Sequence, residues 1–109
     1  MTTYTPDRWV VLEFVGPSMA TPLYKVFAGW YGGYTQGDSW KLNSGIVQVY
    51  QDNDYYEFNG YSGSVYRCKQ SDYHMSGLMR TVLDRWTQKA AQHGDLNIRI
   101  LDIAEVALL

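Results

Sequence analysis

The sequence contains one thiol and two imidazoles, the side chains from which nucleophilic and metal-binding sites are built. Cys68 is the single cysteine, and the two histidines are His74 and His93. A catalytic cysteine needs a base close in space and a surrounding that lowers the thiol pKa, and a zinc site needs ligands at paired spacings. These three residues show neither pattern. We therefore expect Cys68 to be a core residue, and we predict no metal and no cofactor.

Three short motifs come close to known catalytic or ligand-binding patterns without matching them. Residues 60–64, Gly-Tyr-Ser-Gly-Ser, end in Ser where a nucleophile elbow ends in Gly, and they lie in a hairpin loop. The glycines of residues 29–37 lack the dinucleotide and P-loop spacings. Asp52, Asp54 and Glu57 lack the calcium-loop pattern and are typical of a solvated turn. The sequence therefore predicts that the protein is not an enzyme.

Aromatic residues are the most distinctive feature of the composition. There are ten Tyr, four Trp and three Phe, together 16% of the chain. A rigid ring with a polar edge often anchors a protein interface, because it gives a large contact area at low entropic cost. Alternation turns about half of the aromatic residues in strands inward. We predict that a partner is bound by five rings around a glycine-rich loop and a later hairpin: Trp30, Tyr31, Tyr34, Trp40 and Tyr61.

The same rings support a second interpretation, a protein that binds single-stranded nucleic acid. Bases would stack on exposed Tyr and Trp while basic side chains meet the phosphates; the candidates are Lys25, Lys41, Arg67 and Lys69. Nine basic and eleven acidic residues give a net charge of −2, which disfavours general attraction to phosphate or to an anionic membrane. The charge balance therefore favours a protein partner.

The length limits the architecture to one domain. A chain of 109 residues, 46% hydrophobic and 18% charged, has enough apolar side chains for one core, so we predict a single domain over residues 1–109. No run approaches the roughly 20 apolar residues of a membrane span, and residues 1–4 lack the pattern of a signal peptide. A lone cysteine fits a reducing compartment. We expect a cytoplasmic protein without membrane contact.

Two strands are predicted in the first third of the chain. Arg8–Val15 is rich in β-branched and aromatic residues and is closed by Gly16-Pro17. Residues 23–31 alternate between two faces, with Tyr24, Val26, Ala28 and Trp30 on one and Leu23, Lys25, Phe27 and Tyr31 on the other.

Residues 32–69 continue the pattern of strands and turns. We predict a long glycine-rich loop over 32–39, a return to the sheet at 40–42, and a turn or bulge at 43–45. Residues 46–50, 55–58 and 65–68 are separated by short polar or glycine-containing loops. Their spacing predicts two successive hairpins and hence an antiparallel meander.

One amphipathic helix follows the meander. Apolar residues recur every three or four positions after residue 74; they are Met75, Leu78, Met79, Val82, Leu83, Trp86 and Ala90. The helix begins either at Ser71-Asp72 or at Ser76, because both can cap a helix. Gly94 supplies the residue that commonly ends one.

The C-terminal segment allows two interpretations. Leu96, Ile98 and Ile100 alternate with polar residues, which predicts a last strand, within the sheet or at its edge, that runs to Ile103. Residues 102–109 form either part of this strand or a short helix, since Asp102 and Glu105 have the spacing of a capping box. The predicted fold class is α+β, with an antiparallel sheet of five to six strands, one helix packed across it and a late C-terminal strand.

Self-association is also predicted. Exposed rings, an edge strand near the C-terminus and the apolar end Val106-Ala107-Leu108-Leu109 are features that favour pairing with another chain. A symmetric dimer is the commonest form of such pairing. We expect a homodimer more than a monomer.

Several segments between Gly29 and Ser76 carry a resemblance to known sequences. They are Gly29-Trp30-Tyr31-Gly32-Gly33, the stretch from Ser39 to Ile46, Tyr55-Tyr56-Glu57-Phe58, and the stretch from Gly60 to Tyr66. Together they resemble small uncharacterised proteins of tailed bacteriophages and prophages. The resemblance implies a bacterial host cytoplasm and no catalytic residues, since small phage accessory proteins often bind and block a host protein.

The composition and the resemblance together lead to one prediction of function. We expect a non-enzymatic protein-binding module, a phage-encoded accessory protein that binds and modulates a host factor. The alternatives are a single-stranded nucleic-acid binder and a virion or assembly component. Fold and setting alone do not decide among these functions.

Overall fold

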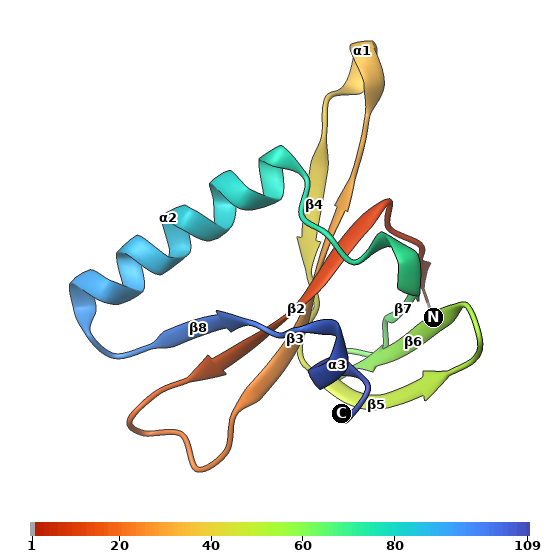
Figure 1. Ribbon diagram of the computed structural model, residues 1–109. Coiled ribbons are helices and arrows are strands. Elements are labelled where there is room, and N and C mark those ends of the chain that lie inside the picture. Colours follow the sequence, from red (N-terminus) through yellow and green to blue (C-terminus); the bar gives the residue numbers. More distant parts are fainter. Residues whose placement is uncertain (1) are drawn as a thin grey trace.

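Two four-stranded sheets and one long helix are stacked in the order helix, sheet, sheet (Figure 1). The computed structural model describes residues 2–109, apart from the side chains of residues 34 and 35. The inner sheet has the strand order β4 (Ser39–Leu42), β3 (Leu23–Trp30), β2 (Arg8–Val15) and β8 (Asn97–Ile100). The outer sheet has the order β1 (Thr3–Tyr4), β7 (Val65–Lys69), β6 (Tyr55–Gly60) and β5 (Ile46–Gln51).

The α+β class is as predicted, whereas the arrangement of the strands is different. They divide into two sheets of four instead of one sheet of five to six. The division occurs at residues 43–45, where the chain leaves the inner sheet after β4 and starts the outer sheet with β5. Gly45 has a φ of 136° at this corner, a conformation that suits glycine far better than other residues.

Strand β2 lies in the middle layer and is covered on both faces. Trp9 and Val11 belong to the core between the two sheets, and Val10 and Leu12 belong to the core beneath the helix. All four are almost completely buried. A strand covered on both faces is continuously apolar instead of alternating, which is why this segment has an unbroken run of hydrophobic residues.

The core between the sheets is largely aromatic. The inner sheet contributes Trp9 to a cluster with Tyr56 and Phe58 of the outer sheet, and the ring centroids of Trp9 and Phe58 are 5.4 Å apart. Cys68 and Tyr66 of β7 complete the outer wall of this core. Alternation predicts that about half of the aromatic residues in the strands face inward. These inward-facing rings form the packing surface of the outer sheet.

The C-terminal segment ends in a helix. Strand β8 stops at Ile100, and α3 (Ile103–Val106) follows, so the predicted continuation of the strand to Ile103 is wrong and the helical alternative is correct. The Asp102 N–H donates to Glu105 Oε1 at 3.0 Å at the start of α3. Val106 is buried in the core between the sheets, so this apolar side chain contributes to packing within the chain.

Helix α2 (Gly77–His93) covers the other face of the inner sheet. Its apolar stripe packs on the sheet as predicted, with Met79 and Leu83 fully in the core. A Cβ at Gly29 would lie 2.4 Å from Met79 Sδ, so the glycine permits this close approach. No helix in the described part of the chain is long and apolar enough to cross a membrane.

Helix α2 begins at one of the two predicted starts and ends at the predicted glycine. Ser76 caps the helix, its Oγ accepting a hydrogen bond from the Met79 N–H at 3.2 Å. The alternative start, Ser71-Asp72, lies in a separate 3-10 turn, Gln70–Asp72. Gly94 ends the helix in a left-handed conformation (φ 68°), and its N–H donates to the Ala90 carbonyl at 2.8 Å.

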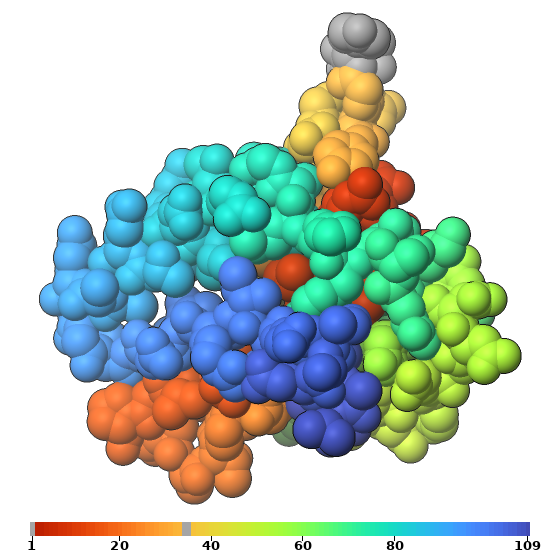
Figure 2. Space-filling view, viewed as in Figure 1, coloured from red at the N-terminus to blue at the C-terminus, as the bar shows by residue number. Residues whose placement is uncertain are grey.

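The connection between β3 and β4 forms a projecting arm. The predicted loop over residues 32–39 instead contains a four-residue helix, α1 (Gly33–Gln36), at the tip. Figure 2 shows the ends of β3 and β4, in orange and yellow, standing out from the body of the molecule. A helix this short has too few positions to show an apolar period, so the sequence pattern does not reveal it.

Strands β5, β6 and β7 form the predicted antiparallel meander. Asp52 closes its first turn: its Oδ1 accepts the N–H groups of Asp54 and Tyr55, at 2.9 and 2.7 Å. These hydrogen bonds, with a smaller contribution from Arg67, lower the pKa of the Asp52 carboxyl. Strand β1 adds to β7 in parallel, so the outer sheet is not wholly antiparallel.

Candidate functional site

The fold does not bring the thiol and the imidazoles together. Cys68 is fully buried between the sheets, and burial raises the pKa of its thiol. His74 precedes α2 and His93 ends it, so the length of the helix, about 25 Å, separates them. Within residues 2–109 no group of three or more His, Cys, Asp or Glu side chains could hold a metal ion.

The motif at residues 60–64 and the acidic turn have structural roles. Ser62 lies in the turn between β6 and β7, where its N–H donates to Ser44 Oγ at 2.8 Å and its Oγ accepts a hydrogen bond from the same hydroxyl. Arg67 pairs with Asp52 and Glu57, at 3.3 and 3.8 Å. The hydrogen bonds between Ser44 and Ser62 therefore link two turns. The Arg67 guanidinium pairs with two of the three carboxylates of the acidic turn.

Two of the predicted binding rings, Trp30 and Trp40, point to opposite faces of the inner sheet. Trp30 faces the outer sheet, with its ring centroid 6.1 Å from that of Tyr4 and its Nε1 donating to the Thr5 carbonyl at 3.0 Å. Trp40 faces the helix, with its ring centroid 5.2 Å from that of Trp86. The sequence places them close along the chain, but the strand register separates their side chains.

The other predicted rings lie further apart. Tyr31 is 51% exposed at the end of β3, near the Arg8 guanidinium. Tyr61 is 83% exposed in the turn between β6 and β7. The side chain of Tyr34 lies outside the described residues. The described rings therefore do not form a single surface, although Trp30 and the backbone of Trp40 meet at the groove described next.

Strand β4 forms one edge of the inner sheet and leaves backbone groups unpaired. At its end, the Asn43 N–H donates to the Val26 carbonyl at 2.9 Å, and the Val26 N–H donates to Asn43 Oδ1 at 2.8 Å. Because antiparallel hydrogen bonds alternate along a strand, Lys41 also bonds toward β3. The N–H and C=O groups of Trp40 and Leu42 consequently point away from β3.

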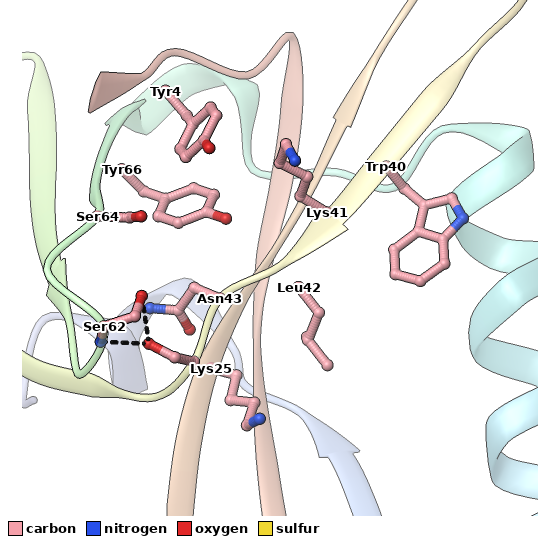
Figure 3. A pocket seen from close by; sticks show the side chains of 10 residues that line it. Tyr4, Lys25, Trp40, Lys41, Leu42, Asn43, Ser62, Ser64 and Tyr66 are labelled. Atoms are coloured by element: carbon pink, nitrogen blue, oxygen red, sulfur yellow. Dashed lines mark hydrogen bonds between the residues drawn. The ribbon is translucent and has the colours of Figure 1, made fainter. Parts of the chain in front are cut away.

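Two adjoining cavities border this free edge, and we call them together the β4 groove. One has a volume of about 450 Å³ and the other about 430 Å³, and Tyr4, Trp40 and Lys41 line both. In Figure 3 the Trp40 ring turns away toward α2, so it is the backbone of Trp40 that faces the groove. Each cavity is within the size range of small ligand sites.

The floor of the β4 groove is formed by two tyrosines of the outer sheet. The rings of Tyr4 and Tyr66 lie 5.0 Å apart, and Tyr66 is only 3% exposed. Its hydroxyl points toward the inner sheet (Figure 3). Among the described residues, tyrosine hydroxyls form hydrogen bonds at Tyr24 and Tyr73, and those of Tyr4 and Tyr66 have no protein partner.

The groove carries positive charge. The Lys41 Nζ lies 5.2 Å from the centroid of the Tyr4 ring, and it forms no ion pair with the described carboxylates. The described side chains that line the two cavities include lysines, serines and tyrosines and no carboxylate. Burial, with a further contribution from Tyr4, raises the pKa of Tyr66 to about 12, so its hydroxyl remains a hydrogen-bond donor at neutral pH.

Asn43 fixes the end of the groove. It is 3% exposed and its Nδ2 is buried without a hydrogen-bond partner in the described structure. A Cβ at Gly60 would lie 3.2 Å from this nitrogen, so the glycine leaves room for the amide. The amide holds β4 against β3 at the corner where the chain passes to the outer sheet.

The basic residues proposed for phosphate contact do not form one track. Lys25 lies on the helix side of the inner sheet, with its Nζ 5.9 Å from the centroid of the Phe14 ring. Arg67 alternates with the buried Tyr66 and Cys68, so it lies on the outer face of the outer sheet, where it pairs with two carboxylates. Lys25 and Lys41 both line one cavity of the β4 groove, and of these residues Lys41 lines both cavities.

Sequence reasoning missed Tyr4, Asn43 and Tyr66 as members of a site. The polar Arg67 lies between Tyr66 and Cys68, and this alternation indicates that Tyr66 and Cys68 share the inward face. Tyr4 lies in a two-residue strand whose pairing with β7 is distant in sequence, and no local pattern predicts such a pairing.

Compared with known protein families, with curated proteins and with solved structures, the chain has no match.

Proposed function

We propose that this protein is a binding module that takes up an extended segment of a protein partner by adding it as a strand to β4. The observation that carries this proposal is the free edge at Trp40 and Leu42, whose backbone groups face the β4 groove. Addition of a strand to an exposed edge is a recurrent way of recognising a peptide, with main-chain hydrogen bonds supplying affinity.

The other three edge strands are less suited to accept a partner. Strand β1 has two residues, and the register of β5 with β6 shifts between Ile46 and Gln48; irregularities of this kind protect an edge from pairing. Arg99 of β8 is tied to Glu13 and Glu105. Strand β4 keeps an unbroken register with β3 and borders the two cavities.

A protein partner also agrees better with the charges than nucleic acid does. A phosphate track needs several free basic side chains along one surface, whereas Arg67 is paired and Lys25 lies on another face. The proposal includes no catalytic step. The identity of the partner as a host factor, the homodimer and the cytoplasmic location stay predictions.

Fluorescence anisotropy with a defined peptide tests the strand addition. The probe is a short labelled peptide, blocked at both ends, in which valine alternates with aspartate. Leu42→Pro removes the outward N–H without breaking a hydrogen bond to β3, and proline is tolerated at such edge positions. Leu42→Ala is the matched control, because it truncates the same side chain and keeps the N–H.

We expect the wild type and Leu42→Ala to bind the peptide, and Leu42→Pro to bind at least about tenfold more weakly, from the lost hydrogen bond and the obstructed edge. Thermal melting of each variant verifies that it is folded. Equal affinity of the Pro and Ala variants would contradict strand addition at β4, and so would failure of the wild type to bind both this peptide and a valine–asparagine peptide of the same length.

A further inference from the structure

We infer that the β4 groove holds a carboxylate side chain of the added strand, at a site formed by Lys41, Tyr4 and Tyr66. This inference rests on the proposed strand addition and specifies the chemistry that it selects. We call these three residues the carboxylate site.

The strand register places the carboxylate site beside one face of an added strand. Lys41 is directly opposite Ala28, and Ala28 is buried in the core between the sheets. Paired residues project to the same face of a sheet, so Lys41 points toward the outer sheet, where Tyr4 and Tyr66 lie. Every second side chain of a strand added to β4 would project into this space.

The groups available there are hydrogen-bond donors that lack acceptors. An ammonium group has only donors, and a carboxylate has only acceptors. Tyr66 is 3% exposed, and its hydroxyl opens onto the groove without a protein partner among the described residues. A polar group that a bound ligand covers needs a hydrogen-bond partner in that ligand, and Ser64 lines the same cavity with a further hydroxyl.

The charge of the site discriminates among the side chains that a partner could offer. No described carboxylate lines the groove, so a lysine or arginine of the partner would meet Lys41 without a counter-charge. An apolar side chain would cover the ammonium and the hydroxyl groups and leave them unpaired. A site often gains specificity in this way, because wrong partner side chains bind with an unfavourable free energy.

Paired peptides test the site. The valine–aspartate peptide is compared with a valine–asparagine peptide of the same length, which has similar shape and no charge. Binding of both is measured for the wild type, Lys41→Met and Tyr66→Phe. Two exposed residues outside the site supply matched controls, Lys69→Met and Tyr61→Phe.

We expect the wild type and both controls to bind the aspartate peptide about tenfold or more tightly than the asparagine peptide. The reason is that a hydrogen bond to a charged group contributes more free energy than one to a neutral group. Lys41→Met should remove most of this difference, and Tyr66→Phe should reduce it. Equal binding of the two peptides to the wild type, or a difference that persists in both site variants, would overturn the carboxylate site. Strand addition would still hold if Leu42→Pro remained defective.

If neither peptide binds, strand addition fails, and acetate then decides on the site by itself. Amide signals of Lys41, Ser64 and Tyr66 are followed by NMR as sodium acetate is added, with sodium chloride as the control for ionic strength. Saturable shifts in the wild type that are absent in Lys41→Met would support the site. Shifts that are equal in both proteins, or absent, would overturn it.

Discussion

The hydroxyl of Tyr73 completes a sheet at the point where its ladder ends. Strand β8 pairs with β2 as far as Ile100, and beyond it the Leu101 N–H donates to the Val11 carbonyl at 2.9 Å. The Tyr73 hydroxyl accepts a hydrogen bond from the Val11 N–H at 3.1 Å and donates to the Leu101 carbonyl at 2.6 Å. One side chain thus serves two backbone groups of the middle layer.

Removing this hydroxyl should be costly. Tyr73→Phe leaves a backbone N–H and a carbonyl without their partner, and we expect the free energy of unfolding to fall by about 1–3 kcal/mol. Tyr50→Phe is the control, because Tyr50 is 51% exposed and should change stability little. Urea denaturation of both variants measures the difference, and a Tyr73→Phe midpoint equal to that of the control would contradict the bridging role.

The buried tyrosines also predict how stability responds to alkali. Burial is the main cause that raises the pKa of Tyr66 and of Tyr73 to about 12, whereas a tyrosine in the unfolded chain ionises near pH 10. Below about pH 10 the folded and unfolded chains hold the same phenolic protons. As the pH rises further, the unfolded chain releases them first, so the free energy of unfolding should decrease between about pH 10 and 12.

Tyr73→Phe isolates one of these contributions. Free energies of unfolding from denaturant titrations at about pH 9 and about pH 11 give the alkaline loss of stability for each protein. We expect a smaller loss in Tyr73→Phe than in the wild type and an unchanged loss in Tyr61→Phe, since Tyr61 is exposed. Identical losses in all three proteins would show that the buried phenol does not resist ionisation.

At the scale of elements, the start of α2 offers a direct comparison of two serines. Ser76 is 3% exposed and caps the helix, whereas Ser71 is exposed in the preceding turn. Ser76→Ala should lower the free energy of unfolding by about 0.5–2 kcal/mol, the usual cost of losing an N-cap. Ser71→Ala should be nearly neutral. Chemical denaturation measures both, and equal effects would place the cap elsewhere.

Elements with a strong local signal could be predicted from the sequence. Arg8–Val15 is β2 with the same bounds, and the apolar stripe after Met75 together with Gly94 marks α2. Helix α1 has four residues in a glycine-rich segment and no apolar period to reveal it. At the C-terminus two valid signals competed, and the capping pair Asp102 and Glu105 prevailed because Val106 is buried as part of a helix.

At the scale of the whole molecule, the division into two sheets depends on pairing that is distant in sequence. The unbroken apolar run Trp9–Leu12 is typical of a strand covered on both faces. The run alone does not show which elements cover those faces. The β4 groove has the same origin, because Tyr4, Lys41 and Tyr66 are brought together from three distant segments. Local patterns placed Trp30 and Trp40 near one another, and the register turned their rings to opposite faces.

Amide hydrogen exchange in β4, followed by NMR with and without the valine–aspartate peptide, tests strand addition most directly. In the free protein we expect fast exchange at Trp40 and Leu42, whose N–H groups point away from β3, and slow exchange at Lys41. Saturation with the peptide should slow exchange at Trp40 and Leu42 and leave Lys41 unchanged. Exchange at Trp40 and Leu42 that stays fast when the peptide is bound would contradict the addition of a strand to this edge.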